Sequence, residues 1–496
     1  MFEDKKKLYF IIAGIVALIT IGVVIFVMTR PAPKVVVDTS PVVLNWWKIS
    51  EGYDEAAFAE IVASFQKQPG NAKVSVNMLK KDWSESYYTN LISDFARGIG
   101  PDLYTLRNDD LPSYKEFLAP IEIFKGKLLT DYRQNFVDLA VRETMDKDKV
   151  YGVTSYVDNL QLYYNKTLLS QSLITNPARD WKELTDQAMN LTRRNVNTDE
   201  FVQSAIALGT GGRSPEDLKP NIDQIDKILP TLIFQAGGQL WDYQKNQSIF
   251  GSPKNLDDVK NGGQTGTNLA VGGNRDGTFG VGKIDQDTPT YRAIRFFADF
   301  GDVSTRRYSW NNKMKSNVDL FMEGKVAYMV NFRSFEKTIQ QRNNRLNYDI
   351  TELPQLDSSI KRTFGQFFMD GISRRVLQDV EQTKTPAAIR KYQKAQEFLE
   401  FLTRPVNQFK ITNAAKLPGA HREIIAEQLK GDQITKIFAG GSLYADNYYK
   451  PNVKRSEKMW LDLFEKIHYQ NIELPTALSS TIQEYNLQAQ EGTKNR

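Results

Sequence analysis

The sequence predicts an α/β protein whose body is divided into two lobes and follows a single transmembrane helix. Residues 8–28 form an unbroken apolar run that is long enough to span a bilayer. The rest of the 496-residue chain is too long for one hydrophobic core, so two lobes are expected. Its first part alternates strand patterns with amphipathic-helix patterns, which is typical of sheets that are covered by helices.

The apolar run is expected to be a retained anchor and not a cleaved signal peptide. Roughly 20 residues at 1.5 Å per residue cross a hydrocarbon core about 30 Å thick, whereas a signal peptide has an apolar region of about 7–15 residues. No good cleavage site follows the run. Three lysines at positions 5–7 precede it and only Arg30 and Lys34 follow it closely, so we expect a cytoplasmic N-terminus and a body outside the cytoplasm at the cell membrane.

A spacer is expected between this anchor and the body. We assign residues 1–34 to the cytoplasmic stub, the anchor and the start of the spacer, and residues 35–41 to the rest of the spacer. The prolines in this segment favour an extended, semi-rigid chain. Because the chain has no cysteine, it has neither a disulfide nor a thiol for a lipid anchor, so the helix must hold the body at the membrane.

Composition and motifs argue against several classes of function. The net charge of +5 comes from 64 basic and 59 acidic residues, so no nucleic-acid partner is expected. His421 and His468 are the only histidines, and with no cysteine a metal site is not expected. The sequence has no nucleophile elbow and no phosphate-binding loop, so we expect no catalytic residue and no cofactor. A carboxylate pair for glycoside hydrolysis, drawn from Asp109, Asp110 and Asp158, stays open as an alternative.

Strands and helices are expected to alternate from residue 42 onward. Strands are predicted at residues 42–47, 74–78 and 103–106, with amphipathic helices around residues 58–65 and 88–95 between them. Ligands bind at the carboxyl ends of strands in such sheets. The residues at these positions are Trp46, Trp47 and Lys48 after the first strand and residues 107–110 after the third.

Later segments continue the mixed pattern. A strand is predicted at residues 326–331, and helices are predicted around residues 389–402 and 459–467. The glycine-rich stretch 261–282 is interpreted as an inserted loop or hairpin with a type I′ turn at Asp276-Gly277. Cation binding by this stretch is a weaker alternative, because the further acidic ligands of a calcium loop are absent.

Seven short segments resemble one known family and follow its order along the chain. The most specific one runs from Tyr151-Gly152-Val153 to Tyr164-Asn165-Lys166. The other six are residues 100–104 (GPDLY), 111–120, 180–184 (DWKEL), 235–238 (QAGG), 321–329 and 398–405. On these motifs the chain resembles the family 1 extracellular solute-binding proteins of bacterial ABC importers, the maltose-binding-protein type.

This resemblance implies a two-lobed periplasmic-binding-protein-like fold of type II, in which each lobe is a mostly parallel sheet flanked by helices. One lobe would comprise residues 42–156 and 351–415, and the other residues 157–350 and 416–496. The chain would cross between them near Val157, Ile350 and Leu417. The ligand would be clamped as the hinge closes, and permease subunits would receive it.

The resemblance also implies ligand-binding residues, because sugars bind through aromatic rings on the pyranose face and through carboxylates and amides at the hydroxyl rim. The candidates are Trp46, Trp47, Lys48, Glu51, Asp109, Asp158, Trp241, Asn331, Phe332, Phe335, Phe367, Phe368, Asp370 and Tyr444. Alternation along a strand sends only one of Trp46 and Trp47 to each face, so one of them is expected in the core. Leu106 stands where sugar binders often have a tryptophan, and the lipobox cysteine of lipid-anchored relatives is missing.

The sequence therefore suggests a membrane-anchored receptor outside the cytoplasm that captures a small solute, a carbohydrate by resemblance, for an ABC importer. Two alternatives stay open. One is an enzyme that acts on glycans, and the other is a signalling or adhesion module on the same fold.

Overall fold

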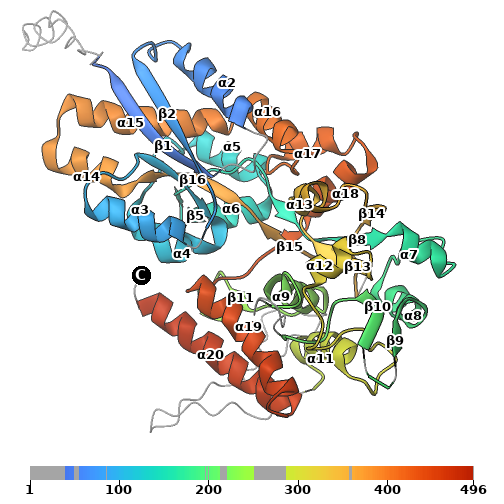
Figure 1. Cartoon of the computed structure of the whole chain (residues 1–496). Helices are drawn as coiled ribbons and strands as arrows, with labels where there is room; N and C mark the ends of the chain where they lie inside the picture. The colour runs from blue at the N-terminus through green and yellow to red at the C-terminus, as the bar shows by residue number, and fades with distance from the viewer. Residues whose placement is uncertain are drawn as a thin grey trace, which may run out of the picture. The chain divides into compact units, whose positions relative to one another are not determined.

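Two mixed β-sheets, each covered by helices, make up the body of the protein (Figure 1). The computed structural model describes residues 40–49, 55–84, 86–195, 197–198, 200–212, 220–250, 286–356 and 360–494. Residues 41–496 form one compact unit. The predicted anchor at residues 8–28, the candidate Glu51 and the glycine-rich stretch 261–282 lie outside the described residues. Among the helices that are described, none has both the length and the apolar character to cross a membrane.

The first sheet contains the three strands predicted near the N-terminus. Its order is β2 (Val74–Lys81), β1 (Val42–Ile49), β3 (Leu103–Arg107), β16 (Phe368–Ser373) and β4 (Leu118–Ala119). Strand β1 runs parallel to β2 and β3, whereas β16 runs antiparallel to β3 and β4. Around it lie α2 (Glu55–Gln66), α3 (Ser86–Ala96), α4 (Leu111–Tyr114), α5 (Lys127–Asn135), α6 (Asp138–Thr144), β5 (Met145–Asp146), β6 (Lys149–Val150), α14 (Arg374–Thr383), α15 (Pro386–Leu402) and α16 (Pro405–Ala415).

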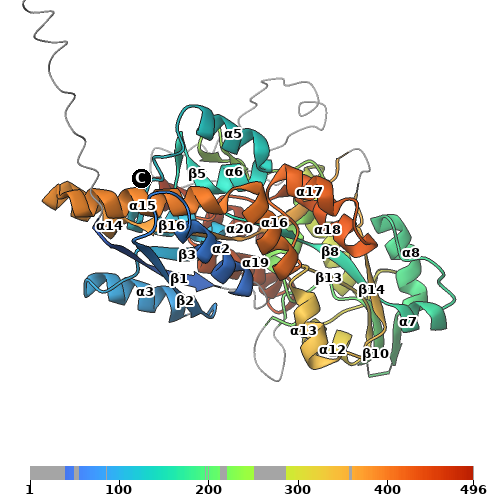
Figure 2. The ribbon, with the colours of Figure 1, turned by 90° about the horizontal axis from the view of Figure 1, so that it is seen from above.

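Alternation along β1 decides which helices cover which face of this sheet. The Trp46 ring is fully buried and makes edge contacts with Phe58 of α2 and Phe398 of α15, both at 5.3 Å between ring centroids. Trp47 points to the other face, where its ring lies 6.4 Å from that of Tyr87 in α3. Figure 2 shows α15 and α3 on opposite sides of the strands. The sheet is therefore covered on both faces, as the alternating pattern predicted.

The second sheet has the order β14 (Tyr348–Thr351), β8 (Gln161–Asn165), β13 (Val326–Asn331), β10 (Glu200–Ile206) and β9 (Arg193–Asn195). Only the β10–β13 pairing in it is parallel, so the prediction of a mostly parallel sheet is wrong for this lobe. The reason is that β8 lies between β13 and β14 and runs opposite to both. Hydrophobic periodicity identifies a strand but carries no information about its direction.

Helices pack against this second sheet and build a separate hydrophobic core. They are α7 (Lys166–Gln171), α8 (Trp181–Leu191), α9 (Ile225–Gln235), α11 (Pro289–Ala298), α12 (Asn317–Met322), α13 (Phe335–Arg342), α19 (Val453–His468) and α20 (Leu474–Lys494). The long helices α19 and α20 lie side by side (Figure 1). Their buried rings include Trp460 and Tyr485, which both contact Phe250.

A small three-stranded sheet connects the two cores. It has the order β17 (Ala445–Asp446), β15 (Thr363–Gln366) and β7 (Asp158–Asn159). Val157 belongs to the first core and Leu160 to the second, and the chain returns to the first core between Phe364 in β15 and Phe367, which directly precedes β16. Strands β7 and β15 therefore lie where the chain passes between the two cores. The lobe boundaries stay a prediction, and α17 (Arg422–Gln428) contributes Ile425 to the first core.

Candidate functional site

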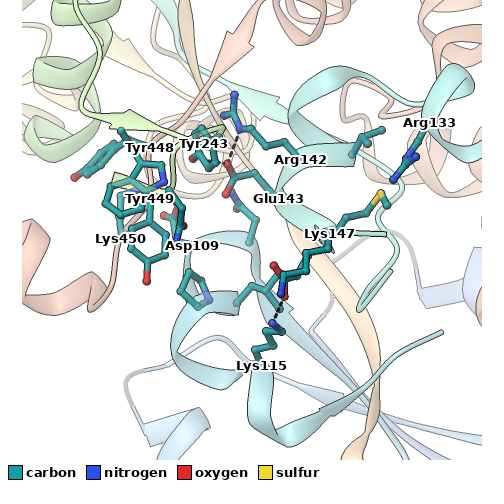
Figure 3. Close-up of a pocket in the computed structure, with 18 residues that line it drawn as sticks. Asp109, Lys115, Arg133, Arg142, Glu143, Lys147, Tyr243, Tyr448, Tyr449 and Lys450 are labelled. Carbon is teal, nitrogen blue, oxygen red and sulfur yellow. Dashed lines mark hydrogen bonds and ion pairs between the residues drawn. The ribbon is translucent and has the colours of Figure 1, made fainter. Parts of the chain in front are cut away.

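A pocket of about 310 Å³ lies where segments of the two cores face each other (Figure 3). The short helical turn after β3 and the end of α6 form one wall. The other wall comes from the β11–β12 hairpin (Trp241–Asp242 and Gln247–Ser248) and from the segment that follows β17. The lining residues are Asn108, Asp109, Leu111, Pro112, Lys115, Arg133, Val141, Arg142, Glu143, Met145, Asp146, Lys147, Trp241, Tyr243, Asn246, Tyr448, Tyr449 and Lys450.

Asp109 joins the two walls of this pocket. Its Oδ1 accepts hydrogen bonds from Lys450 Nζ at 2.7 Å and from Asn447 Nδ2 at 2.8 Å, and its Oδ2 accepts one from Gln366 Nε2 at 2.9 Å. The side chains of Asp109 and Lys450 are each only 1% exposed. Burial alone would raise the pKa of Asp109, but Lys450 and Arg107 outweigh it and hold the pKa well below its usual value. The carboxylate is therefore charged and fully used by groups of the protein itself.

A second polar link lies next to this pair. Arg142 Nε contacts Glu143 Oε1 at 3.0 Å, and Arg142 Nη2 donates to Asp446 Oδ1 at 2.8 Å. The Tyr243 hydroxyl donates to Glu143 Oε1 at 3.0 Å, and its ring lies 4.5 Å from the Arg142 guanidinium (Figure 3). Burial raises the pKa of Glu143 above its ordinary value although Arg142 opposes the shift. Hydrogen bonds thus cross between the two walls at this link as well.

Aromatic rings complete the second wall. The ring of Trp241 is tilted against that of Tyr449 at 4.4 Å, and Trp241 is only 4% exposed. Tyr243 is 39% exposed, so its ring is the one that a bound molecule can reach. Lys147 lines the pocket and is exposed. Rings beside charged donors and acceptors suit a solute that has apolar faces and a hydroxyl rim.

The histidines and acidic residues of the described ranges form no metal site. Within the described ranges, no group of three or more histidine, aspartate or glutamate side chains is arranged to hold a metal ion. The two histidines have separate structural roles. His421 Nδ1 accepts from Glu423 N at the start of α17, and His468 Nε2 contacts the Gly209 carbonyl at 2.8 Å.

Of the thirteen predicted ligand-binding residues that the structure describes, two line this pocket, namely Asp109 and Trp241. Trp47 and Phe368 are half-buried on strands of the first sheet, where the ring of Trp47 lies near that of Tyr87 and the ring of Phe368 lies near that of Trp83. Two groups are packed inside the lobes. They are Trp46, Lys48, Phe367 and Asp370 in the first lobe, and Asn331, Phe332 and Phe335 in the second.

Lys48 and Asp370 form a buried ion pair within the first lobe. Lys48 Nζ lies 2.7 Å from Asp370 Oδ2, and the side chains are 4% and 7% exposed. Asp370 Oδ1 also accepts from Trp46 Nε1 at 3.0 Å and from the Thr105 hydroxyl. These contacts leave no accessible polar atom for a solute, so the three candidates Trp46, Lys48 and Asp370 serve the fold.

Three other candidates are also occupied by contacts within the protein. Asp158 accepts from the backbone N–H groups of Arg333 at 2.8 Å and Ser334 at 3.0 Å, just before α13. Asn331 Nδ2 donates to Asp223 Oδ2 at 3.0 Å. Tyr444 is half-buried next to the hinge strands, where burial raises its pKa to about 12.

Sequence reasoning missed most of the polar residues of the pocket. Arg142, Glu143 and Lys450 lie in a short helix and an irregular segment, where no periodicity or motif marks them. One usable signal in the sequence is the pair Tyr448-Tyr449, which directly precedes Lys450. The structure shows that both tyrosines line the pocket wall.

The sequence is similar to one protein family and to one curated relative. The sequence model of a family described as bacterial extracellular solute-binding protein matches residues 60–426. A curated relative, the galactooligosaccharide-binding protein of Bacillus subtilis, is 22% identical over 305 residues. That match covers 60% of this chain and 57% of the relative, so the chain spans little more than half the length of that relative.

Solved structures share the fold over nearly the whole chain. The cyclic alpha-maltosyl-1,6-maltose binding protein from Arthrobacter globiformis is 15% identical with a TM-score of 0.63, and the match covers 91% of this chain and all of that one. The maltose/maltodextrin-binding domain from Bdellovibrio bacteriovorus, bound to maltotriose, is 16% identical with a TM-score of 0.58 and similar coverage. At these identities the likeness shows a common two-lobed α/β fold.

Proposed function

This chain belongs to the family of bacterial extracellular solute-binding proteins, and from that premise we propose that it captures a carbohydrate between its two lobes and delivers it to an ABC importer. The observation that carries the proposal is the pocket of Figure 3, whose walls come from both cores and combine rings with charged groups. The named ligands of the relatives support the carbohydrate class, because they are oligosaccharides.

The chemistry of the pocket supports this assignment. A pyranose ring has an apolar face that packs against an aromatic ring and a rim of hydroxyls that donate and accept hydrogen bonds. The exposed face of Tyr243 offers the first kind of contact. Glu143, Arg142 and Lys147 offer acceptors and donors around it. The family and the relatives are solute-binding proteins, and the pocket carboxylates Asp109 and Glu143 are each held by donors of the protein itself, so we propose a receptor and not an enzyme.

Closure of the lobes would link binding to delivery. A solute that contacts both walls stabilises the closed state by its differential affinity for that state. Asp109 and Lys450 already bridge the walls, so the solute would add to an existing contact. We further propose that the apolar run at residues 8–28 anchors the body outside the cytoplasm, where permease subunits receive the loaded form.

Calorimetric titration of the residues 41–496 body against galacto- and malto-oligosaccharides tests the proposal. We expect saturable binding that weakens about tenfold, or about 1.4 kcal/mol, in Tyr243→Ala. Tyr469→Ala is the matched control, because Tyr469 is 58% exposed and lies outside the pocket. Absence of heat with every sugar, or equal losses in the two variants, would contradict the assignment.

A further inference from the structure

The carboxylates described in the lining of the pocket in Figure 3 are each paired with a cation of the same lining. The pairs are Asp109 with Lys450, Glu143 with Arg142 and Asp146 with Lys115. The other charged side chains of the described lining are Arg133 and Lys147, and both are cations. Arg133 contacts Asp148 at 2.6 Å, but the side chain of Asp148 is 82% exposed, so water screens much of this interaction. The pairs therefore leave an excess of positive charge in the lining.

Asn108 adds a buried donor to this lining. Its side chain is fully buried, and its Oδ1 accepts a hydrogen bond from the backbone N–H of Phe367 at 2.9 Å. This bond sets the orientation of the amide, because the flipped amide would turn its NH₂ group toward an N–H group. Among the described residues, Nδ2 of Asn108 has no hydrogen-bond partner. A buried donor without a partner costs free energy, so a solute atom that accepts a hydrogen bond here would be stabilised.

A second cavity continues the cationic lining beyond Lys115. Its volume is about 730 Å³, and it shares lining residues with the pocket, Lys115 among them. Lys149 and Arg374 add two cations to its described lining, where Glu116 is the one acidic residue. Arg374 contacts Glu381 at 3.1 Å, but the side chain of Glu381 is 50% exposed. Charges of one sign around a partly enclosed cavity attract solutes of the opposite sign.

We propose that the solute is an acidic sugar whose carboxylate, sulfate or phosphate group is bound by Asn108 and the surrounding cations. The oxygens of such a group accept hydrogen bonds, which is the kind of partner that Asn108 Nδ2 lacks. The same negative charge is attracted by Lys147 in the pocket and by Lys149 and Arg374 in the second cavity. A neutral sugar would leave the excess positive charge uncompensated. This inference rests on the proposed function and names the chemical class of its sugar.

Calorimetry of the full-length protein with matched neutral and acidic sugars tests the inference. The probes are galactose, galactose 6-sulfate, galactose 6-phosphate, galactobiose and digalacturonate. We expect at least one acidic sugar to bind about tenfold more tightly than its neutral counterpart, and the tightest one identifies the acidic group. Its affinity should fall as the NaCl concentration is raised from about 50 mM to about 500 mM, because salt screens the attraction between charges. The affinity for the neutral counterpart should stay within about twofold over the same range.

Two variants locate the acidic group. Asn108→Asp keeps the side-chain acceptor and replaces the free donor by a negatively charged oxygen, so the ratio of acidic to neutral affinity should fall about tenfold. The double variant Lys149→Gln/Arg374→Gln should weaken the acidic sugar about threefold and leave the neutral one within about twofold. The matched control is Arg179→Gln/Lys182→Gln, which removes the same two charges from side chains that are each 86% exposed and lie outside both cavities.

The outcomes separate this inference from the proposed function. If galactose and galactobiose bind as tightly as every acidic probe, the preference for an acidic sugar is overturned while sugar capture stands. If no sugar binds, neutral or acidic, both proposals are overturned. A preference that persists in Asn108→Asp and in Lys149→Gln/Arg374→Gln, or that falls equally in the control, overturns the assignment to these residues. Since Lys149 and Arg374 are partly exposed, their variant keeps the test decisive if Asn108→Asp does not fold.

Discussion

Two buried lysine–aspartate pairs of equal length hold different parts of this molecule. Lys48 and Asp370 lie 2.7 Å apart inside the first lobe, on β1 and β16, with β3 between them. Lys450 and Asp109 also lie 2.7 Å apart, but they join the turn after β3 to a segment that packs with the second core. The same chemistry therefore stabilises one lobe in the first case and the contact between lobes in the second.

The neighbours of each pair decide what its loss would cost. Besides Lys48, Asp370 is the acceptor for Trp46 Nε1 and the Thr105 hydroxyl. Asp109 receives two amide donors besides Lys450, from Asn447 and Gln366. Removing Asp370 would thus strand a cation and two further donors in a closed core, whereas removing Lys450 leaves Asp109 with two partners beside a pocket that water can enter.

The largest expected effect is therefore that of Asp370→Ala. Breaking a buried pair by removing one partner typically costs about 3–5 kcal/mol, because the remaining charge has no compensation. We expect a decrease of this size in the free energy of unfolding, measured by urea denaturation. The double variant Lys48→Met/Asp370→Leu should recover most of it. A loss below about 1 kcal/mol in the single variant would show that the pair contributes little to the lobe.

Lys450→Met should affect the arrangement of the lobes more than their stability. We expect a decrease of about 1–3 kcal/mol in the free energy of unfolding, since Asp109 keeps its two amide donors. The radius of gyration in small-angle X-ray scattering should increase as the lobes separate. Asp370→Ala, measured under conditions in which it stays folded, should leave the radius of gyration unchanged. An increased radius of gyration in the Asp370 variant, or an unchanged one in the Lys450 variant, would contradict the different roles assigned to the two pairs.

The sequence predicted the elements well because hydrophobic spacing is local. The strand predicted at residues 326–331 is β13, and Phe58, Ile61 and Phe65 are buried in α2 as their spacing indicated. Strand direction in the second sheet was not predictable, because it depends on which distant strand lies next to β8.

The site was much harder to predict than the fold. Lys48 lies near the end of β1, Asp109 in the turn after β3 and Asp370 within β16. Nothing in the sequence tells which of them has its partner across the two lobes. That depends on Lys450, whose position is fixed only when the chain returns through β17. Charged residues at strand ends thus indicate the edge of a sheet, and tertiary contacts decide whether a charge stabilises the core or faces the solute.

The smallest expected effect concerns the acid sensitivity of the contact between lobes. The folded-state pKa of Asp109 lies below its unfolded value, so its contribution to stability is complete above the unfolded pKa and is lost as the pH falls toward the folded pKa. The difference in free energy of unfolding between wild type and Asp109→Asn should stay constant from pH 7 to pH 5. It should change by less than about 0.5 kcal/mol down to pH 4 and decrease more steeply only at lower pH. Urea denaturation of both proteins at each pH measures this difference. A decrease that begins near pH 6 would mean that Lys450 and Arg107 do not hold this carboxylate in its charged form. The pair of Asp109 and Lys450 would then contribute little to the contact between the lobes.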